Sequence, residues 1–185
     1  MKNGKILVCQ LLDFKLLYTL SEHKSSVCCL QIDEQKIVSG SSDESIIIWD
    51  FATGSILHKI TYHTSRIVRL KFDKDLLISC AMNRTLLIFD ISDLNNVKLI
   101  RNLFLNELKL KNQSLICNGV DLNGKYLVAG LSRNIGVWDR NERFKLLSLI
   151  EAHEDVITSL ILFDEQFVIS GSNDKTVKRL IFIRF

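Results

Sequence analysis

Proline is absent from this chain of 185 residues, and no apolar run approaches the length that a membrane-spanning helix needs. Charge of one sign is not concentrated anywhere, because 24 lysines and arginines oppose 21 aspartates and glutamates and leave a net charge of only +3. This balance offers no basic surface to nucleic acid or to an anionic membrane. With no low-complexity linker and no break in composition, we expect one domain over residues 1–185 and no direct contact with nucleic acid or membrane.

The motifs that carry catalysis or hold cofactors are missing as well. Four histidines show no metal-ligand spacing, and no glycine-rich loop matches a phosphate-binding pattern. The five cysteines have no C-x-x-C spacing and lie mostly in apolar runs, which predicts reduced thiols in the core of a cytoplasmic or nuclear protein. They are Cys9, Cys28, Cys29, Cys80 and Cys117. No cleavable signal peptide is expected, since Gln10 and Asp13 interrupt the apolar N-terminal stretch. We therefore expect no cofactor, no metal and no enzymatic activity.

What the chain does contain is a repeat. A set of five residues recurs 40 residues later in the sequence, and parts of it recur twice more. The first set is His23, Ser39, Asp43, Trp49 and Asp50; the second is His63, Ser79, Asn83, Phe89 and Asp90; the third ends at Trp138-Asp139; the fourth holds His153, Ser170 and Asp174. A period near 40 residues is typical of propeller blades. The units are expected at approximately 16–55, 56–97, 98–146 and 147–185, after a lead-in strand at 5–15.

The local pattern within each unit favours strands. In the first unit, β-branched and bulky apolar runs at 27–32, 36–40 and 46–49 are separated by turn formers such as Ser41-Ser42-Asp43. Runs this short do not make helices. One helix is expected around Asn106–Lys111, where the spacing between units expands to 49 residues.

These residues resemble the WD-repeat (beta-transducin-like) family over nearly the whole chain. The resemblance is carried by CLQIDEQKIVSGSSDESIIIWD at 29–50, DLLISCAMNRTLLIFD at 75–90 and GKYLVAGLSRNIGVWD at 124–139. It implies an all-β fold, a β-propeller with about four WD-type four-stranded blades, and a non-enzymatic scaffold for protein–protein interaction. Within the family, the texture is most similar to the F-box/WD-repeat substrate receptors of ubiquitin ligases. A component of an RNA-processing or other ribonucleoprotein assembly, and a truncated non-functional fragment, stay open as alternatives.

The histidines, serines and acidic residues of the repeat suggest a catalytic triad at first sight. In WD repeats these positions form a buried structural tetrad instead, in which each polar group finds a partner. A triad would not recur in several blades, so the structural interpretation is favoured. The tetrad is complete at His23, Ser39, Asp43 and Trp49. It is worn at His63, Ser79 and Asn83, where Phe89 replaces Trp; at Trp138, which has no matching His; and at His153, Ser170 and Asp174, where Leu180 replaces Trp.

The family resemblance also implies where a partner binds. Two positions in each unit point to one face of a propeller: the residue before the innermost strand and the residue before the tetrad acid. In this chain they are Ser26, Ser42, Arg66, Met82, Val156 and Asn173, with Asn118 and Arg133 as the nearest equivalents in the third unit. Loops on a rigid scaffold are the usual place of recognition.

The expected partners are proteins, with ubiquitin-ligase components or their substrates as the narrower version. The ligase receptors that the chain resembles bind doubly phosphorylated peptides through arginines on this face. Here only Arg66 and Arg133 are available, and Glu154 and Asp155 would repel phosphate. No segment resembles an F-box either, so we do not carry phosphopeptide binding over to this chain.

Four units leave the propeller short, since the family usually closes its ring with seven blades. The lead-in resembles two strands, Ile6–Gln10 and Leu16–Leu20. A propeller left open exposes apolar blade faces and unpaired strand edges. We therefore expect an open or incomplete ring: either a truncated product, or a chain that completes itself with a partner or associates with a second copy through its open blade edges.

Overall fold

The computed structural model describes residues 4–104, 108, 117–164 and 167–181. The described residues form 17 strands in five antiparallel sheets. This confirms the predicted all-β fold, and within these ranges no helix is long and apolar enough to cross a membrane. The helix expected around Asn106–Lys111 lies outside the described residues, apart from Leu108.

We label the sheets A to E in chain order. Half-blade A pairs β1 (Ile6–Cys9) with β2 (Leu16–Leu20). Blade B contains β3 (Val27–Ile32), β4 (Lys36–Ser41), β5 (Ile46–Asp50) and β6 (Ile56–Ile60). Blade C contains β7 (Ile67–Phe72), β8 (Leu76–Ala81), β9 (Thr85–Asp90) and β10 (Lys98–Phe104). Blade D contains β11 (Cys117–Leu122), β12 (Tyr126–Leu131), β13 (Asn134–Asp139) and β14 (Lys145–Glu151). Blade E contains β15 (Ile157–Phe163), β16 (Phe167–Ser172) and β17 (Val177–Ile181).

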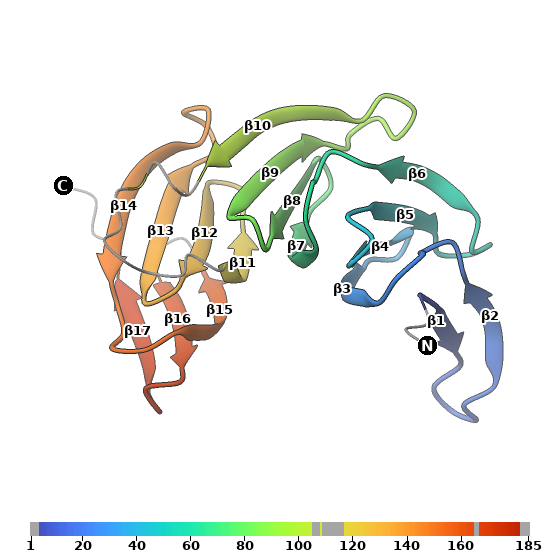
Figure 1. Ribbon diagram of the computed structural model, residues 1–185, viewed down its shortest axis with the longest axis horizontal. Coiled ribbons are helices and arrows are strands. Elements are labelled where there is room, and N and C mark those ends of the chain that lie inside the picture. The colour runs from blue at the N-terminus through green and yellow to red at the C-terminus, as the bar shows by residue number, and fades with distance from the viewer. Residues whose placement is uncertain (1–3, 105–107, 109–116, 165–166, 182–185) are drawn as a thin grey trace.

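The blades follow one another along an open arc (Figure 1). Half-blade A and blade E lie at its two ends, and the three complete four-stranded blades lie between them. Each sequence unit supplies the outer strand of one blade and the inner three strands of the next, which ties neighbouring blades together through the chain. The predicted open, incomplete propeller is the observed one.

Side chains fix the turns that set the strand register. At the first turn of blade B, the Asp33 carboxylate accepts hydrogen bonds from the backbone amides of Gln35 and Lys36, at 2.8 and 2.7 Å. Asp73 and Asn123 repeat this turn in blades C and D. The next turn bends through a left-handed residue, with φ of 70° at Glu44 and 67° at Arg84. Such turns reverse the chain within a few residues, as short antiparallel strands require.

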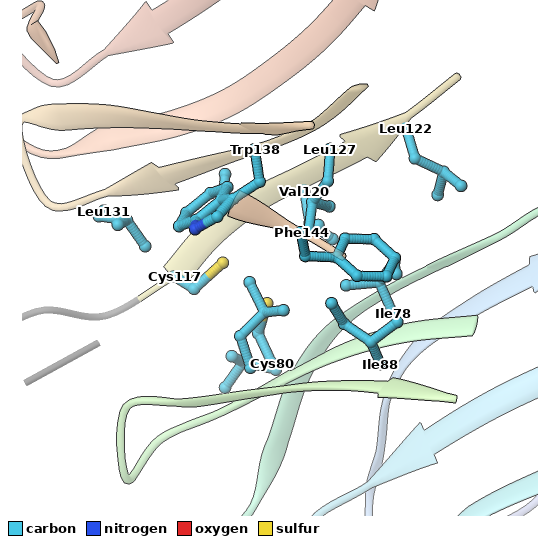
Figure 2. Packing of buried hydrophobic residues seen from close by; sticks show 13 residues of the cluster. Ile78, Cys80, Ile88, Cys117, Val120, Leu122, Leu127, Leu131, Trp138 and Phe144 are labelled. Carbon is cyan, nitrogen blue, oxygen red and sulfur yellow. The ribbon is translucent and has the colours of Figure 1, made fainter. Parts of the chain in front are cut away.

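The core consists of apolar layers between neighbouring blades, which we call seams. The seam between blades C and D gathers Ile78, Cys80 and Ile88 from one side and Leu127, Trp138 and Phe144 from the other (Figure 2). Close approach needs small residues on the inner strands: an added Cβ at Gly40 would lie 2.6 Å from Ile67 of the next blade. Polar links join the blades too, since the Gln31 side chain exchanges two hydrogen bonds with the backbone of Phe72. Burial of these seams is the main stabilising term.

Candidate functional site

The structure brings the four tetrad residues of blade B together. His23 donates from Nδ1 to the Asp43 carboxylate at 3.0 Å, and its Nε2 accepts from the Ser39 hydroxyl at 2.8 Å. The Trp49 indole N–H donates to the same hydroxyl oxygen at 2.8 Å. His23, Ser39 and Trp49 are buried, and every buried polar side-chain atom of the set has a hydrogen-bond partner. The network connects the loop before β3 to the turn between β4 and β5 and holds both in place.

Charge strengthens this network. Partial burial by itself would raise the pKa of the Asp43 carboxyl, but hydrogen bonds from Ser45, from the backbone amide of Lys24 and from His23 lower that pKa to about 2. The Lys24 amide lies 2.7 Å from the carboxylate. Asp43 is therefore ionised at neutral pH and anchors the loop that precedes β3.

Blade C keeps the same arrangement with neutral partners. His63 contacts the Ser79 hydroxyl at 2.7 Å, and its Nδ1 contacts Thr85 at 3.2 Å. Thr85 in turn donates to the Asn83 side chain at 2.8 Å. Because no carboxylate compensates for its burial, desolvation lowers the pKa of His63 to about 4. His63 is thus a neutral structural residue.

Among the blades with incomplete tetrads, blade E keeps the most tetrad residues and blade D the fewest. In blade E, His153 binds Asp174 and Ser170, each at 2.8 Å, although Leu180 stands in the tryptophan position. In blade D, Ala129 pairs at the position of the tetrad serine, so Trp138 has no hydroxyl acceptor there. Trp138 packs over Gly136 instead, where an added Cβ would lie 2.4 Å from its ring. Blade D relies on apolar packing.

A fifth residue, which carries a hydroxyl, joins the tetrads of blades B, C and E and was not predicted from the sequence. Ser45, Thr85 and Thr176 each lie 3.2 Å from Nδ1 of the local histidine and also bond to the residue at the acid position. The signal was present in the sequence: a serine or threonine two residues after Asp43, Asn83 and Asp174.

Three of the predicted partner-binding residues converge on one point, the junction of blades B and C. The Cys28 thiol lies 3.2 Å from the Ser42 hydroxyl and 3.4 Å from the backbone carbonyl of Ser26. Arg66 of the next blade reaches across and donates from Nε to the Cys28 sulfur at 3.2 Å. We call Ser26, Cys28, Ser42 and Arg66 the junction cluster. Arg66 is exposed and the other three are half-buried, so the cluster faces solvent on the loop side of the arc.

The remaining predicted residues lie on the same side of the arc but outside the junction cluster. Met82 is exposed beside Arg66, whose carbonyl accepts from the Met82 amide. Asn173 is exposed and bonded through its amide to Val156 in blade E. Arg133 is engaged by Glu151 at 3.3 Å. Asn118 sits in a β-bulge of β11, at the position that Cys28 takes in β3, so the third-unit counterpart of Arg66 falls in 109–116, outside the described residues.

The cysteines near this face differ in environment. Burial, followed by the nearby Cys28 thiol, raises the pKa of Cys29 to about 12, which makes that thiol unreactive at neutral pH. Cys80 is fully buried, and desolvation raises its pKa as well. Among the cysteines described, Cys28 is the one that belongs to the junction cluster.

The opposite side of the arc carries a groove of about 730 Å³ between blades C and D. Its lining includes Ile100, Arg101 and Arg143, together with Arg140, which is paired with Asp73 at 2.6 Å. In the part of the chain that the structure describes, no group of three or more His, Cys, Asp or Glu side chains is arranged to hold a metal ion.

Comparison with known proteins agrees with this geometry. The family model described as WD domain, G-beta repeat matches residues 14–50 and 144–178. These two stretches include the histidine, serine and acid of blades B and E, the two blades in which an aspartate completes the histidine contact. The matches support a WD-repeat family. The chain has no significant match among curated proteins.

Two designed proteins of known structure are similar to the chain. The computationally designed Ika8 protein is 25% identical with a TM-score of 0.81, and the match covers 98% of this chain but 54% of Ika8. The computationally designed Ika4 protein is 26% identical with a TM-score of 0.73, covering 88% of this chain and 94% of that one. The chain therefore spans about half the length of Ika8.

Proposed function

We propose that this WD-repeat chain is a non-enzymatic scaffold that binds another protein at the loop face, with the junction cluster at the centre of the contact. The observation that carries the proposal is the convergence of Ser26, Ser42 and Arg66 on the Cys28 thiol. These positions come from two blades, so a ligand that contacts all of them binds across the junction between blades B and C. The pinned loops of blade B fix their geometry before binding, which lowers the entropic cost of association.

The chemistry of the cluster indicates the kind of partner. Arg66 uses only Nε on Cys28, so its two terminal nitrogens are directed to no side chain in the contacts of the described residues. A fork of this kind suits a carboxylate of the partner. Exposed Met82 beside it adds an adaptable apolar contact. We propose an acidic residue flanked by an apolar one as the feature that is recognised.

Tetrad geometry favours binding over catalysis. The histidine and serine of each set are buried and bonded to one another in blades B, C and E. A substrate cannot reach such a buried pair, and an active site would not require the same pair in three blades.

The narrower version of the proposal is a substrate receptor for a ubiquitin ligase in the cytoplasm or nucleus. Its support is the likeness of the sequence to that subgroup. Affinity capture with mass spectrometry tests it, because ligase-core subunits among the captured proteins support the narrower version, and ribonucleoprotein subunits in their place would replace it.

The junction cluster itself is tested by charge reversal. We expect Arg66→Glu to lose the proteins that the wild-type chain captures. Lys74→Glu is the matched control: it makes the same charge change, at an exposed position in the same blade, in the turn between β7 and β8 on the opposite side. Unchanged capture by Arg66→Glu, or equal loss from both variants, would overturn the assignment of the loop face.

A further inference from the structure

The first end of the arc exposes residues whose counterparts are buried in the seam between blades B and C. Leu30 and Ile32 on β3 are 53% and 49% exposed. Strand pairing places them at the positions of Leu70 and Phe72 on β7, which are 8% and 4% exposed in the seam between blades B and C. Leu30 and Ile32 are exposed because, among the described residues, half-blade A has no inner two strands to cover them.

The second end shows the same contrast on the other side of a blade. Ile169 and Val177 occupy the positions of Val38 and Ile46 in blade B, both of which are fully buried, whereas Val177 is 75% exposed. Ile161 and Phe163 on β15 add exposed apolar surface. This face of blade E is built like a seam, and no described sheet packs against it.

The two ends are complementary in strands. Half-blade A holds the outer two strands of a blade, β1 and β2, and its inner edge is unpaired among the described residues. Blade E holds the inner three strands and, in the same ranges, no outer one. Together they have one strand too many in the third position, which β1 and β17 both occupy.

Residue pattern decides between those two strands. On β1, all four residues are apolar or cysteine, as on β5 up to its tryptophan. On β17, Lys178 and Arg179 stand where blade B buries Ile47 and Ile48. Burying two cations in a seam is costly, so β1 is the better third strand of a completed blade.

One position on the innermost strands also supports contact between the two ends. Gln31 and Asp121 bond to the backbone of the following blade, at Phe72 and Leu162. The equivalent residue of blade E is Ile161, and the residue that would face it across a new seam is Ile32. Both are apolar and exposed, so an apolar contact would take the place of the polar link at the new seam.

We propose that two copies of this chain associate head to tail, with β15 and β16 of each copy supplying the missing inner strands of the partner's half-blade A. In the shared blade, β1 pairs with β16 of the other copy and displaces β17. Three complete blades from each copy and two shared blades give a closed ring of eight. Such a heterologous contact closes when the rotation between copies matches the curvature of the arc.

A known structure of about twice this length supports the pairing of two such arcs. Nearly the whole chain superimposes on about half of Ika8, so a structure about twice as long contains this same arc. Both ends belong to one chain and are unlike each other, so a second copy offers each end the surface that it lacks (Figure 1).

Measurement of mass in solution tests the association. Light scattering after size exclusion is expected to give twice the chain mass for the wild type. Leu30→Glu is expected to give the monomer, because it places a charge in the new seam. The same substitution should leave the fold of the single arc intact, since Leu30 is exposed there. Ile100→Glu is the matched control, because Ile100 is 49% exposed on β10, away from both ends, and this variant is expected to remain a dimer. A monomeric wild type, or a dimeric Leu30→Glu, would overturn the proposal.

Strand exchange is tested separately by a disulfide. The register of blade B, where Val38 faces Ile48, predicts that Val8 of one copy faces Ile169 of the other. The double variant Val8→Cys/Ile169→Cys is expected to form a covalent dimer under oxidising conditions, and Val8→Cys/Ile100→Cys is not. Val8 is on β1 and Ile169 is on β16, and these strands lie at opposite ends of one arc, so this disulfide cannot form within a chain (Figure 1). A doubled mass without this crosslink would overturn the exchange of β17 for β1. Arg66→Glu leaves the association intact, which separates this result from failure of the loop-face proposal.

Discussion

Blades B and D have the same four antiparallel strands and hold them by different means. Blade B has a complete polar tetrad around His23, while blade D has Ala129 at the serine position and packs Trp138 on Gly136. Both are nevertheless buried to a similar extent along their middle strands. The seams therefore hold the blades together, whereas the tetrads hold the loops on the side where we propose that a partner binds.

Removing seam volume should have the largest effect, whatever tetrad the blade has. Ile88 lies fully buried in the seam between blades C and D (Figure 2). Ile88→Ala is expected to lower the free energy of unfolding by about 2–5 kcal/mol through lost transfer energy and the cavity left behind. Denaturant unfolding measures it, with Ile100→Ala as an exposed control within about 0.5 kcal/mol of wild type. Equal effects from both would contradict the role given to the seams.

The dependence of stability on pH tests the buried, neutral histidine of blade C. The pKa of His63 is lowered to about 4 in the fold by burial, whereas an unfolded histidine titrates near 6.5. The unfolded state therefore binds the proton more readily, so stability is fully present above about pH 6.5 and is lost as the pH falls toward 4. We expect a loss of about 2 kcal/mol between pH 7 and pH 5 from this group.

The variant His63→Gln isolates that contribution. It cannot take up the proton, so the difference in unfolding free energy between it and the wild type should shrink as the pH falls from 7 to 5. A difference that stays constant over this range would show that His63 does not titrate as its environment requires.

Tryptophan-to-phenylalanine exchanges give the smallest effect and the sharpest contrast. Trp49→Phe removes the indole donor to Ser39 and imitates blade C, where Phe89 occupies this position. It should cost about 1 kcal/mol beyond the change in packing, the usual net value of one buried hydrogen bond. Trp138→Phe has no serine hydroxyl to lose at Ala129, so only the packing change is expected. Thermal unfolding of the two variants should therefore differ, and equal losses would remove the distinction between the blades.

The strands and the open arc could be predicted from the sequence because both depend on local pattern. Apolar runs between turn formers gave β3 and β5 nearly to the residue, and the count of units left the ring incomplete. The tetrad residues recurred from unit to unit in the sequence, and their structural role was implied by the resemblance to WD repeats.

The junction cluster could be predicted only in part. Cys28 and Arg66 are 38 residues apart and meet because blades B and C stack. Cys28 looked like one more small core residue, and no local signal gives the rotation between two blades. The hydroxyls of Ser45 and Thr85 were visible in the sequence, but their role follows only from the distance to histidine Nδ1. The end faces needed the exposure of Leu30 and Val177 to be compared with their buried counterparts.

In this account the polar tetrads fix the loops on the proposed binding side, and the seams stabilise the fold. Residue-resolved amide hydrogen exchange on the wild type and on Asp43→Asn tests it most directly. The Lys24 and Ser45 amides donate to the Asp43 carboxylate, so their exchange should accelerate in the variant. Protection in β8 and β9 should stay unchanged, because the seam between blades C and D is untouched. Equal acceleration in all blades, or none at Lys24 and Ser45, would contradict the claim.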